Sequence, residues 1–78
     1  MAKPRRYWMG TTPEKCDICS FVFKSYFVDG ATKGDSGWHG MWGCMCVKCH
    51  RIHGIGLGTG RGQKYKKEAN GVWYKHGG

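Results

Sequence analysis

Apolar residues in this chain gather in short segments that are separated by glycine-rich and charged stretches. Residues 21–28, FVFKSYFV, are rich in aromatic and β-branched residues and predict a strand. Residues 38–46, WHGMWGCMC, predict a second strand that returns beside the first. The intervening residues 29–37 are turn-forming, beginning with Asp29-Gly30. The pattern therefore predicts a β-hairpin in the first half of the chain.

The second half predicts a short helix followed by a second hairpin. Residues 47–54, VKCHRIHG, fit one or two helical turns that end at the final glycine. QKYKK at 63–67 and VWYKH at 72–76 flank Asn70-Gly71, which is a strong hairpin turn signal. No segment has the apolar length that a membrane-spanning helix needs. We expect a small domain that is mostly β with one short helix.

The N-terminal segment differs from the rest because it is basic and contains two prolines, which discourage a helix. YWM at residues 7–9 is apolar enough to dock the end of this segment onto the folded body. We therefore expect a basic arm at residues 1–13 and a single zinc-binding domain at residues 14–78. The segment lacks the apolar run of a secretory signal, so we expect a cytoplasmic protein in a reducing compartment.

Zinc is expected because of the spacing of the cysteines. Cys16 and Cys19 form one C-x-x-C pair, and Cys46 and Cys49 form another, with 26 residues between the pairs. Four thiolates make a closed tetrahedral site that suits structural zinc. A chain of 78 residues with 14 glycines has too small a core for burial alone to stabilise it, so we expect one Zn²⁺ per chain to take part in folding. The expected fold is a zinc ribbon or a treble clef, with two β-hairpins around the metal.

Several alternatives to this site remain open at the level of the sequence. Iron could occupy the same four thiolates. Cys44 could compete with Cys46 for the metal, although a packed or spare thiol is the simpler interpretation. His50 or His53 could replace a cysteine ligand, although such histidines more often cap a turn or face solvent. Residues 46–50, CVKCH, also match a c-type haem attachment pattern, which would require export and leave the first cysteine pair without a role.

Charge is the second functional signal. The chain has 13 Lys and Arg against 5 Asp and Glu, for a formal charge of +8, and residues 41–78 hold most of the excess. Zn²⁺ with four thiolates lowers this charge by two, which still leaves a surface that attracts nucleic acid. We expect Trp73 to supply an exposed aromatic ring for base stacking. The expected phosphate contacts are Lys48, Arg51, Arg61, Lys64, Lys66 and Lys67. We expect Trp42 and Tyr65 in the core instead.

Residues 54–63, GIGLGTGRGQ, alternate glycine with other residues. Neither G-x-G-x-x-G nor G-x-x-x-x-G-K-[ST] fits, so the two common nucleotide-binding loops are excluded. The remaining interpretations are an extended segment packed closely on the body, a backbone nest for an anion, and a flexible linker. Ile55 and Leu57 between the glycines favour the close-packed segment, which would bring Arg61 and Lys64 to the basic face.

Several segments together resemble a family of small uncharacterised phage and prophage proteins. The resemblance covers about residues 16–75 and rests on FVDGATK at 27–33, Trp42, the two cysteine pairs, GIGLGTGRGQKY at 54–65 and NGVWYK at 70–75. It implies a phage product made in bacterial cytoplasm, with a fold like a zinc ribbon or a treble clef. It does not imply an established activity.

Together these observations predict a zinc-stabilised phage-type protein that contacts DNA or RNA through its basic C-terminal half. The alternative is an adaptor or inhibitor that binds a host or phage protein and has no direct nucleic-acid role. We do not expect an enzyme, because four thiolates leave a metal no open coordination position, and the few acidic residues form no recognisable catalytic set.

Overall fold

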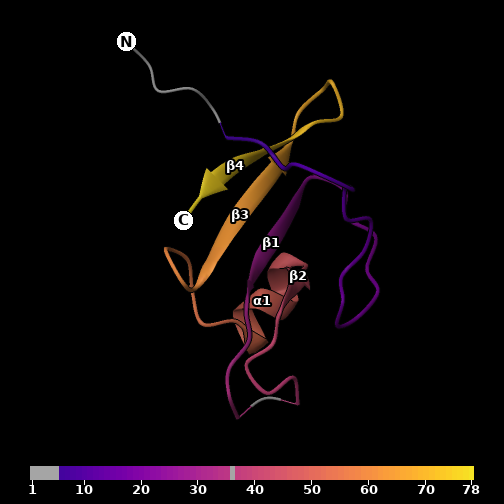
Figure 1. Ribbon diagram of the computed structural model, residues 1–78. Coiled ribbons are helices and arrows are strands. Elements are labelled where there is room, and N and C mark those ends of the chain that lie inside the picture. Colours follow the sequence, from indigo (N-terminus) through magenta and orange to yellow (C-terminus); the bar gives the residue numbers. More distant parts are fainter. Residues whose placement is uncertain (1–5, 36) are drawn as a thin grey trace.

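Figure 1 shows the computed structural model of the chain, which describes residues 6–35 and 37–78. Within these residues, four antiparallel strands form a sheet of order β2-β1-β3-β4, and a short helix packs beside β1 and β2. The elements are β1 at Tyr26–Ala31, β2 at Trp42–Met45, α1 at Val47–His53, β3 at Gly62–Lys67 and β4 at Trp73–Gly77. The expectation of a mostly β domain with one short helix is confirmed. Residues 1–5 of the predicted arm lie outside the described residues.

The first hairpin has the predicted partners but different bounds. β1 pairs with β2 from Val28↔Met45 to Ala31↔Trp42. The prediction that the turn begins at Asp29-Gly30 is wrong, because β1 continues through both residues. Gly30 is instead required by the neighbouring strand, since a Cβ at this position would lie 2.9 Å from the Arg61 carbonyl oxygen.

Residues 21–25 were predicted to belong to the first strand and do not. They return along the residues that precede the first cysteine, with an isolated bridge between Lys15 and Val22. The N–H of Phe23 donates to the carbonyl of Glu14 at 2.9 Å. These hydrogen bonds pair Val22 and Phe23 with the residues before Cys16, and β1 begins only at Tyr26.

The second hairpin is confirmed, including its turn. Lys67 pairs with Trp73, and Gly71 adopts a φ of +81° in the loop between β3 and β4. The Asn70 side chain accepts a hydrogen bond from the N–H of Val72 at 3.0 Å, which stabilises the turn. β1 also pairs with β3, so the two hairpins form one continuous sheet.

The core is aromatic and lies on one face of this sheet. Phe27 is 0% exposed and occupies its centre. Its ring centroid lies 4.9 Å from that of Trp73 in an edge-on contact and 5.1 Å from that of Tyr65 in a stacked contact. Phe23 stacks on Phe27 at 5.2 Å, and Trp8 contacts Phe27 at 5.4 Å. Tyr65 therefore packs against the core as expected.

The described part of the N-terminal segment lies along β4. Tyr7 bridges to Tyr74, and the N–H of Trp8 donates to the carbonyl of Trp73 at 2.8 Å. Met9 does not dock, because it is 78% exposed. The Trp8 ring thus closes one end of the aromatic core, while its backbone partly covers an edge strand that would otherwise present unpaired groups.

Helix α1 begins directly after β2 and ends where the sequence predicts. Cys46 is its N-cap, and Gly54 follows its last turn, donating its N–H to the carbonyl of His50 at 2.8 Å. A Cβ at Gly54 would overlap both the ring and the carbonyl of His50, so this position requires glycine. Among the residues that the structure describes, no helix is long and apolar enough to cross a membrane.

Candidate metal centre

The first cysteine pair lies in a tight turn, residues 15–22, which we call the first cysteine turn. The N–H groups of Ile18 and Cys19 point at the sulfur of Cys16, at 3.4 and 3.5 Å. The N–H of Ser20 donates to the Cys16 carbonyl at 3.0 Å and closes the turn. Backbone donors that face a sulfur favour its thiolate form, which is the form that binds metals.

The second cysteine pair lies at the start of α1. Cys46 caps the helix, and its sulfur accepts a hydrogen bond from the N–H of Cys49 at 3.4 Å. Cys49 is buried in the first turn, so its side chain is directed by the helical backbone. The junction between β2 and α1 therefore positions the sulfurs of Cys46 and Cys49, as the first cysteine turn positions those of Cys16 and Cys19.

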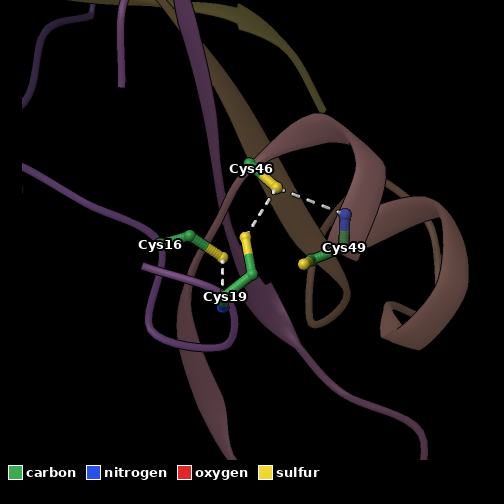
Figure 2. Close-up of side chains that lie close together, drawn as sticks. All are labelled: Cys16, Cys19, Cys46 and Cys49. Atoms are coloured by element: carbon green, nitrogen blue, oxygen red, sulfur yellow. Dashed lines mark hydrogen bonds between the residues drawn. The ribbon is translucent and has the colours of Figure 1, made fainter. Parts of the chain in front are cut away.

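Figure 2 shows the four cysteine side chains converging from these two elements. Their sulfur atoms all lie within 4.8 Å of one another, and the sulfurs of Cys19 and Cys46 are 3.7 Å apart. Four sulfurs at about 2.3 Å from a tetrahedral Zn²⁺ lie about 3.8 Å from one another. The donor set and its spacing thus fit a four-coordinate metal ion.

Asp17 joins the first cysteine turn to the strand that leads to the second pair. Its N–H donates to the carbonyl of Cys44 at 2.9 Å, and its Oδ2 accepts from the N–H of Cys44 at 2.8 Å. Gly43 gives this carboxylate room, because a Cβ there would lie 3.1 Å from the same oxygen. This role of Asp17 was not predicted from the sequence; the available signal was an acidic residue between the two cysteines, combined with a glycine in the facing strand.

The pKa values of the clustered cysteines are shifted in different directions. Burial opposes ionisation of Cys16, yet hydrogen bonds from the backbone and from Cys19 outweigh it and lower the Cys16 pKa to about 7. Burial raises the pKa of Cys46 and of Cys49, and for Cys49 hydrogen bonding within the cluster raises it further. Loading with a divalent metal would therefore release protons from the buried thiols.

Cys44 lies outside the cluster of four. It pairs with Asp29 across β1 and β2 and packs beside the core. Burial raises its pKa to about 12, with further contributions from the charges of Asp29 and Asp17. Its sulfur does not belong to the group of four that lie within 4.8 Å of one another, so the geometry favours Cys46 at the centre.

Replacing Cys44 by alanine is expected to leave metal binding intact. The variant Cys44→Ala should retain one zinc per chain and lose about 1 kcal/mol of stability, the usual cost of a point substitution. Cys46→Ala is the matched comparison two residues away and should lose the metal. Metal analysis with thermal unfolding distinguishes the two, and loss of zinc from Cys44→Ala would contradict the assignment.

Neither candidate histidine belongs to the cluster that the described residues form. The His50 ring binds the backbone instead, since its Nε2 makes a hydrogen bond with the carbonyl oxygen of Gly56 at 2.9 Å. The carbonyl of His53 accepts the N–H of Lys33 at 2.7 Å. These contacts tie the helix to the two loops beside it, which gives both residues a structural role.

The glycine-rich segment is a series of turns, so the prediction of an extended, close-packed segment is wrong over its middle. Gly56, Gly58 and Gly60 have φ values of +106°, +120° and +77°, which glycine adopts readily. Ile55 and Leu57 are 43% and 38% exposed rather than packed down. The prediction neglected that alternating glycines remove the steric bias toward an extended chain.

The same turns use N–H groups that an anion nest would need. The N–H of Gly58 donates to the Gly62 carbonyl at 2.8 Å, and those of Arg61 and Gly62 donate to the Gly58 carbonyl at 3.0 Å. Close approach does occur at the end of the segment. A Cβ at Gly62 would lie 3.0 Å from the Gly56 carbonyl oxygen. The segment therefore serves as a compact connection from α1 to β3.

The expected nucleic-acid contacts fall into separate groups. Lys64 and Lys66 share one face of β3, whereas Lys67 lies on the other face by the two-residue alternation of a strand. Arg61 is exposed in the turn before β3, at the opposite end from Lys66. The remaining two basic residues are exposed on α1 and are three positions apart, Lys48 and Arg51.

Two aromatic predictions are wrong. Trp73 is 4% exposed and belongs to the core, so it is not a stacking surface for bases. Lys67, its partner in the adjacent strand β3, lies over the ring with Nζ 5.9 Å from the ring centroid. Trp42 is 47% exposed rather than buried, because it stands on the edge strand β2 and its indole N–H donates to Asp29 Oδ1 at 2.6 Å.

The fold and the cysteine cluster define a small, β-rich domain with a candidate four-cysteine metal centre. Comparisons of the chain with family models, with curated protein sequences and with solved structures gave no match.

Proposed function

We propose that this chain is a zinc-stabilised module of the treble-clef type. A zinc ribbon takes both cysteine pairs from β-turns, whereas a treble clef takes the second pair from the start of a helix. Here the first pair lies in a turn, β1 and β2 follow as a hairpin, and Cys46 and Cys49 open α1. Four soft thiolates favour zinc, and a closed ligand set supports a structural rather than a catalytic ion.

We further propose that the module binds nucleic acid through the face of the sheet that carries Lys64 and Lys66. The main support is that both lysines flank Tyr26, since Lys66 is its strand partner and the Lys64 Nζ lies 4.6 Å from its ring centroid. His76 contacts the same ring at 5.7 Å. Asp29 falls on the opposite face, so the strand positions around Tyr26 combine positive charge with an aromatic surface.

Binding is expected to weaken as salt rises, and one lysine should account for part of the dependence. Lys66→Ala should lower affinity across sequences and reduce the slope of log K against log salt by about one. Lys67→Ala is the matched control, because it removes the same charge from the next residue on the opposite face. Fluorescence anisotropy over a salt series measures both. Absence of DNA and RNA binding at low salt would refute the proposed function, and equal effects of the two variants would refute the assigned face.

A second candidate function is a protein-binding adaptor. It is favoured by the exposed apolar side chains of Met41 and Trp42, which are 66% and 47% exposed at the β2 edge. Aromatic residues of this kind often anchor protein interfaces. A host partner that is captured after nuclease treatment by the wild type, and not by Trp42→Ala, would support this function over the first.

Phage origin and action in bacterial cytoplasm belong to the proposal and depend on the sequence resemblance alone.

A further inference from the structure

A second feature lies beside the metal centre, between the first cysteine turn, the start of β1 and the start of α1. It is an apolar cleft of about 500 Å³, within the range of roughly 300–1,000 Å³ that is typical of ligand pockets. Its walls combine two aromatic rings with two lysines and contain no carboxylate. The lining residues are Cys19, Phe21, Lys24, Ser25, Tyr26, Cys46, Val47 and Lys48.

Phe21 is the unusual member of this lining. It is 50% exposed, although it is among the most apolar side chains of the chain. Its backbone is held by the metal centre, because its carbonyl accepts the N–H of Cys16 at 2.8 Å. Lys24 lies near the ring with Nζ 6.0 Å from the centroid, at the outer limit of a cation–π contact. The fold thus presents a positioned aromatic ring that its own core does not use.

We infer that this cleft binds one unstacked base of a single-stranded nucleic acid, with Phe21 as the stacking platform. The inference rests on the proposed nucleic-acid binding and specifies the form of ligand. Base–aromatic stacking tolerates any base, because each has a π face. Lys24 and Lys48 on the cleft wall are placed for the phosphates on either side of that base.

The cleft continues into the basic face already described. Tyr26 forms part of the wall, and the Lys64 Nζ lies 4.6 Å from the centroid of its ring. A nucleic-acid strand that leaves the cleft past Tyr26 therefore reaches Lys64 and Lys66 next. An aromatic platform joined to a row of lysines is the arrangement that single-strand binding proteins use.

Charge decides that a base, rather than a phosphate, enters the cleft. The sulfurs of Cys19 and Cys46 lie in its lining, and four thiolates around a divalent cation carry a net negative charge. This charge disfavours a phosphate near the sulfurs and leaves the apolar surface for a base. A duplex cannot supply one, because its bases are stacked and paired, so single strands should be preferred.

A second cleft of similar volume, about 510 Å³, also has two aromatic residues and two lysines in its lining, but it differs because it includes the acidic residue Glu14 and because its rings are buried. Phe23 is 6% exposed. Trp73 is 4% exposed there, so it offers no open ring face. Val22 is 61% exposed and directly follows Phe21, which makes it a matched control for loss of an exposed apolar side chain.

The test is an anisotropy titration of the zinc-loaded protein with labelled oligothymidylate and with a DNA duplex of the same length. Phe21→Ala is expected to weaken oligothymidylate binding by roughly 5- to 150-fold, the effect of losing one stacked base, and to leave duplex binding unchanged. Phe21→Trp should keep wild-type affinity, and so should Val22→Ala. The same titration with oligouridylate shows whether RNA enters the cleft as DNA does, and binding that depends on Phe21 with either probe supports the inference.

Three outcomes overturn the inference in distinguishable ways. If the wild type binds with the expected salt dependence and Phe21→Ala binds equally well, the cleft is not the base site and the proposed function stands. If the wild type binds neither probe at low salt, both fail. A dimer of the wild type that Phe21→Ala abolishes would show that a second copy covers the cleft, which also overturns the inference.

A measurement on the unmodified protein guards against misfolding of the variant. An oligonucleotide that carries 5-bromodeoxyuridine should crosslink on irradiation to the segment that contains Phe21 and Tyr26, as identified by mass spectrometry. A crosslink confined to residues outside the cleft, such as Trp42, would overturn the inference.

Discussion

Removal of the metal with a chelator is expected to unfold this protein, and one equivalent of Zn²⁺ is expected to restore it. The core is small, and its largest fully buried side chains are those of Phe27, Met45, Val28 and Cys16. A core in a chain of this size supplies roughly 3–5 kcal/mol, whereas structural zinc supplies apparent free energies of about 10–16 kcal/mol. The first cysteine turn would lose its main connection to α1, and the 14 glycines favour the unfolded chain.

Circular dichroism and NMR spectra with metal analysis, before and after chelation, test this expectation. Cys49→Ala should behave like the chelated protein, because its sulfur belongs to the cluster. Cys44→Ala removes the same group from a partly buried position outside the cluster and serves as the matched control. A stable fold without metal, or two metal ions per chain, would refute a closed four-cysteine centre.

Phe27→Ala is expected to have the largest effect of any substitution away from the metal centre. Its ring is 0% exposed and contacts those of Trp73, Tyr65 and Phe23. A Phe→Ala change in a packed core costs about 3–5 kcal/mol, which corresponds to a Tm lower by about 12–40 °C for a domain of this size. Thermal unfolding in the presence of zinc measures the shift.

Phe21→Ala provides the comparison, because it removes the same atoms from a ring that is 50% exposed. Its Tm should change much less, since little packing is lost and no large cavity forms. Equal shifts for the two variants would contradict the position of the core. The pair also separates stability from binding, because only Phe21→Ala should act on the single-strand titration while the domain stays folded.

Local sequence patterns predicted the elements that short-range interactions determine. The C-x-x-C spacing predicted two turns that direct paired sulfurs, Asn70-Gly71 predicted the second hairpin, and VKCHRIHG predicted α1. Each depends on residues within a few positions of one another. The prediction failed at residues 21–25, where strand-like composition was outweighed by hydrogen bonds to the residues before Cys16.

Alternation along a strand predicts two sets of side chains but not which set is buried. Trp73 and Lys67 share a face with the aromatic core, and Lys66 shares the other face with Tyr26. The pairing of β3 with β1 makes this choice, because it sets Tyr65 against Phe27. The sequence alone therefore assigned Trp73 to the surface and grouped Lys67 with Lys66.

The sequence by itself determined the four cysteines of the candidate centre, the short helix, the second hairpin and the excess of positive charge, because spacing, turn chemistry and composition are local or additive. Only the tertiary structure decided the face on which each lysine lies, the link from Asp17 to Cys44 and the cleft beside Phe21. These features arise where segments distant in the chain meet. Their positions depend on strand register and on the convergence of the cysteine pairs, which no local pattern encodes.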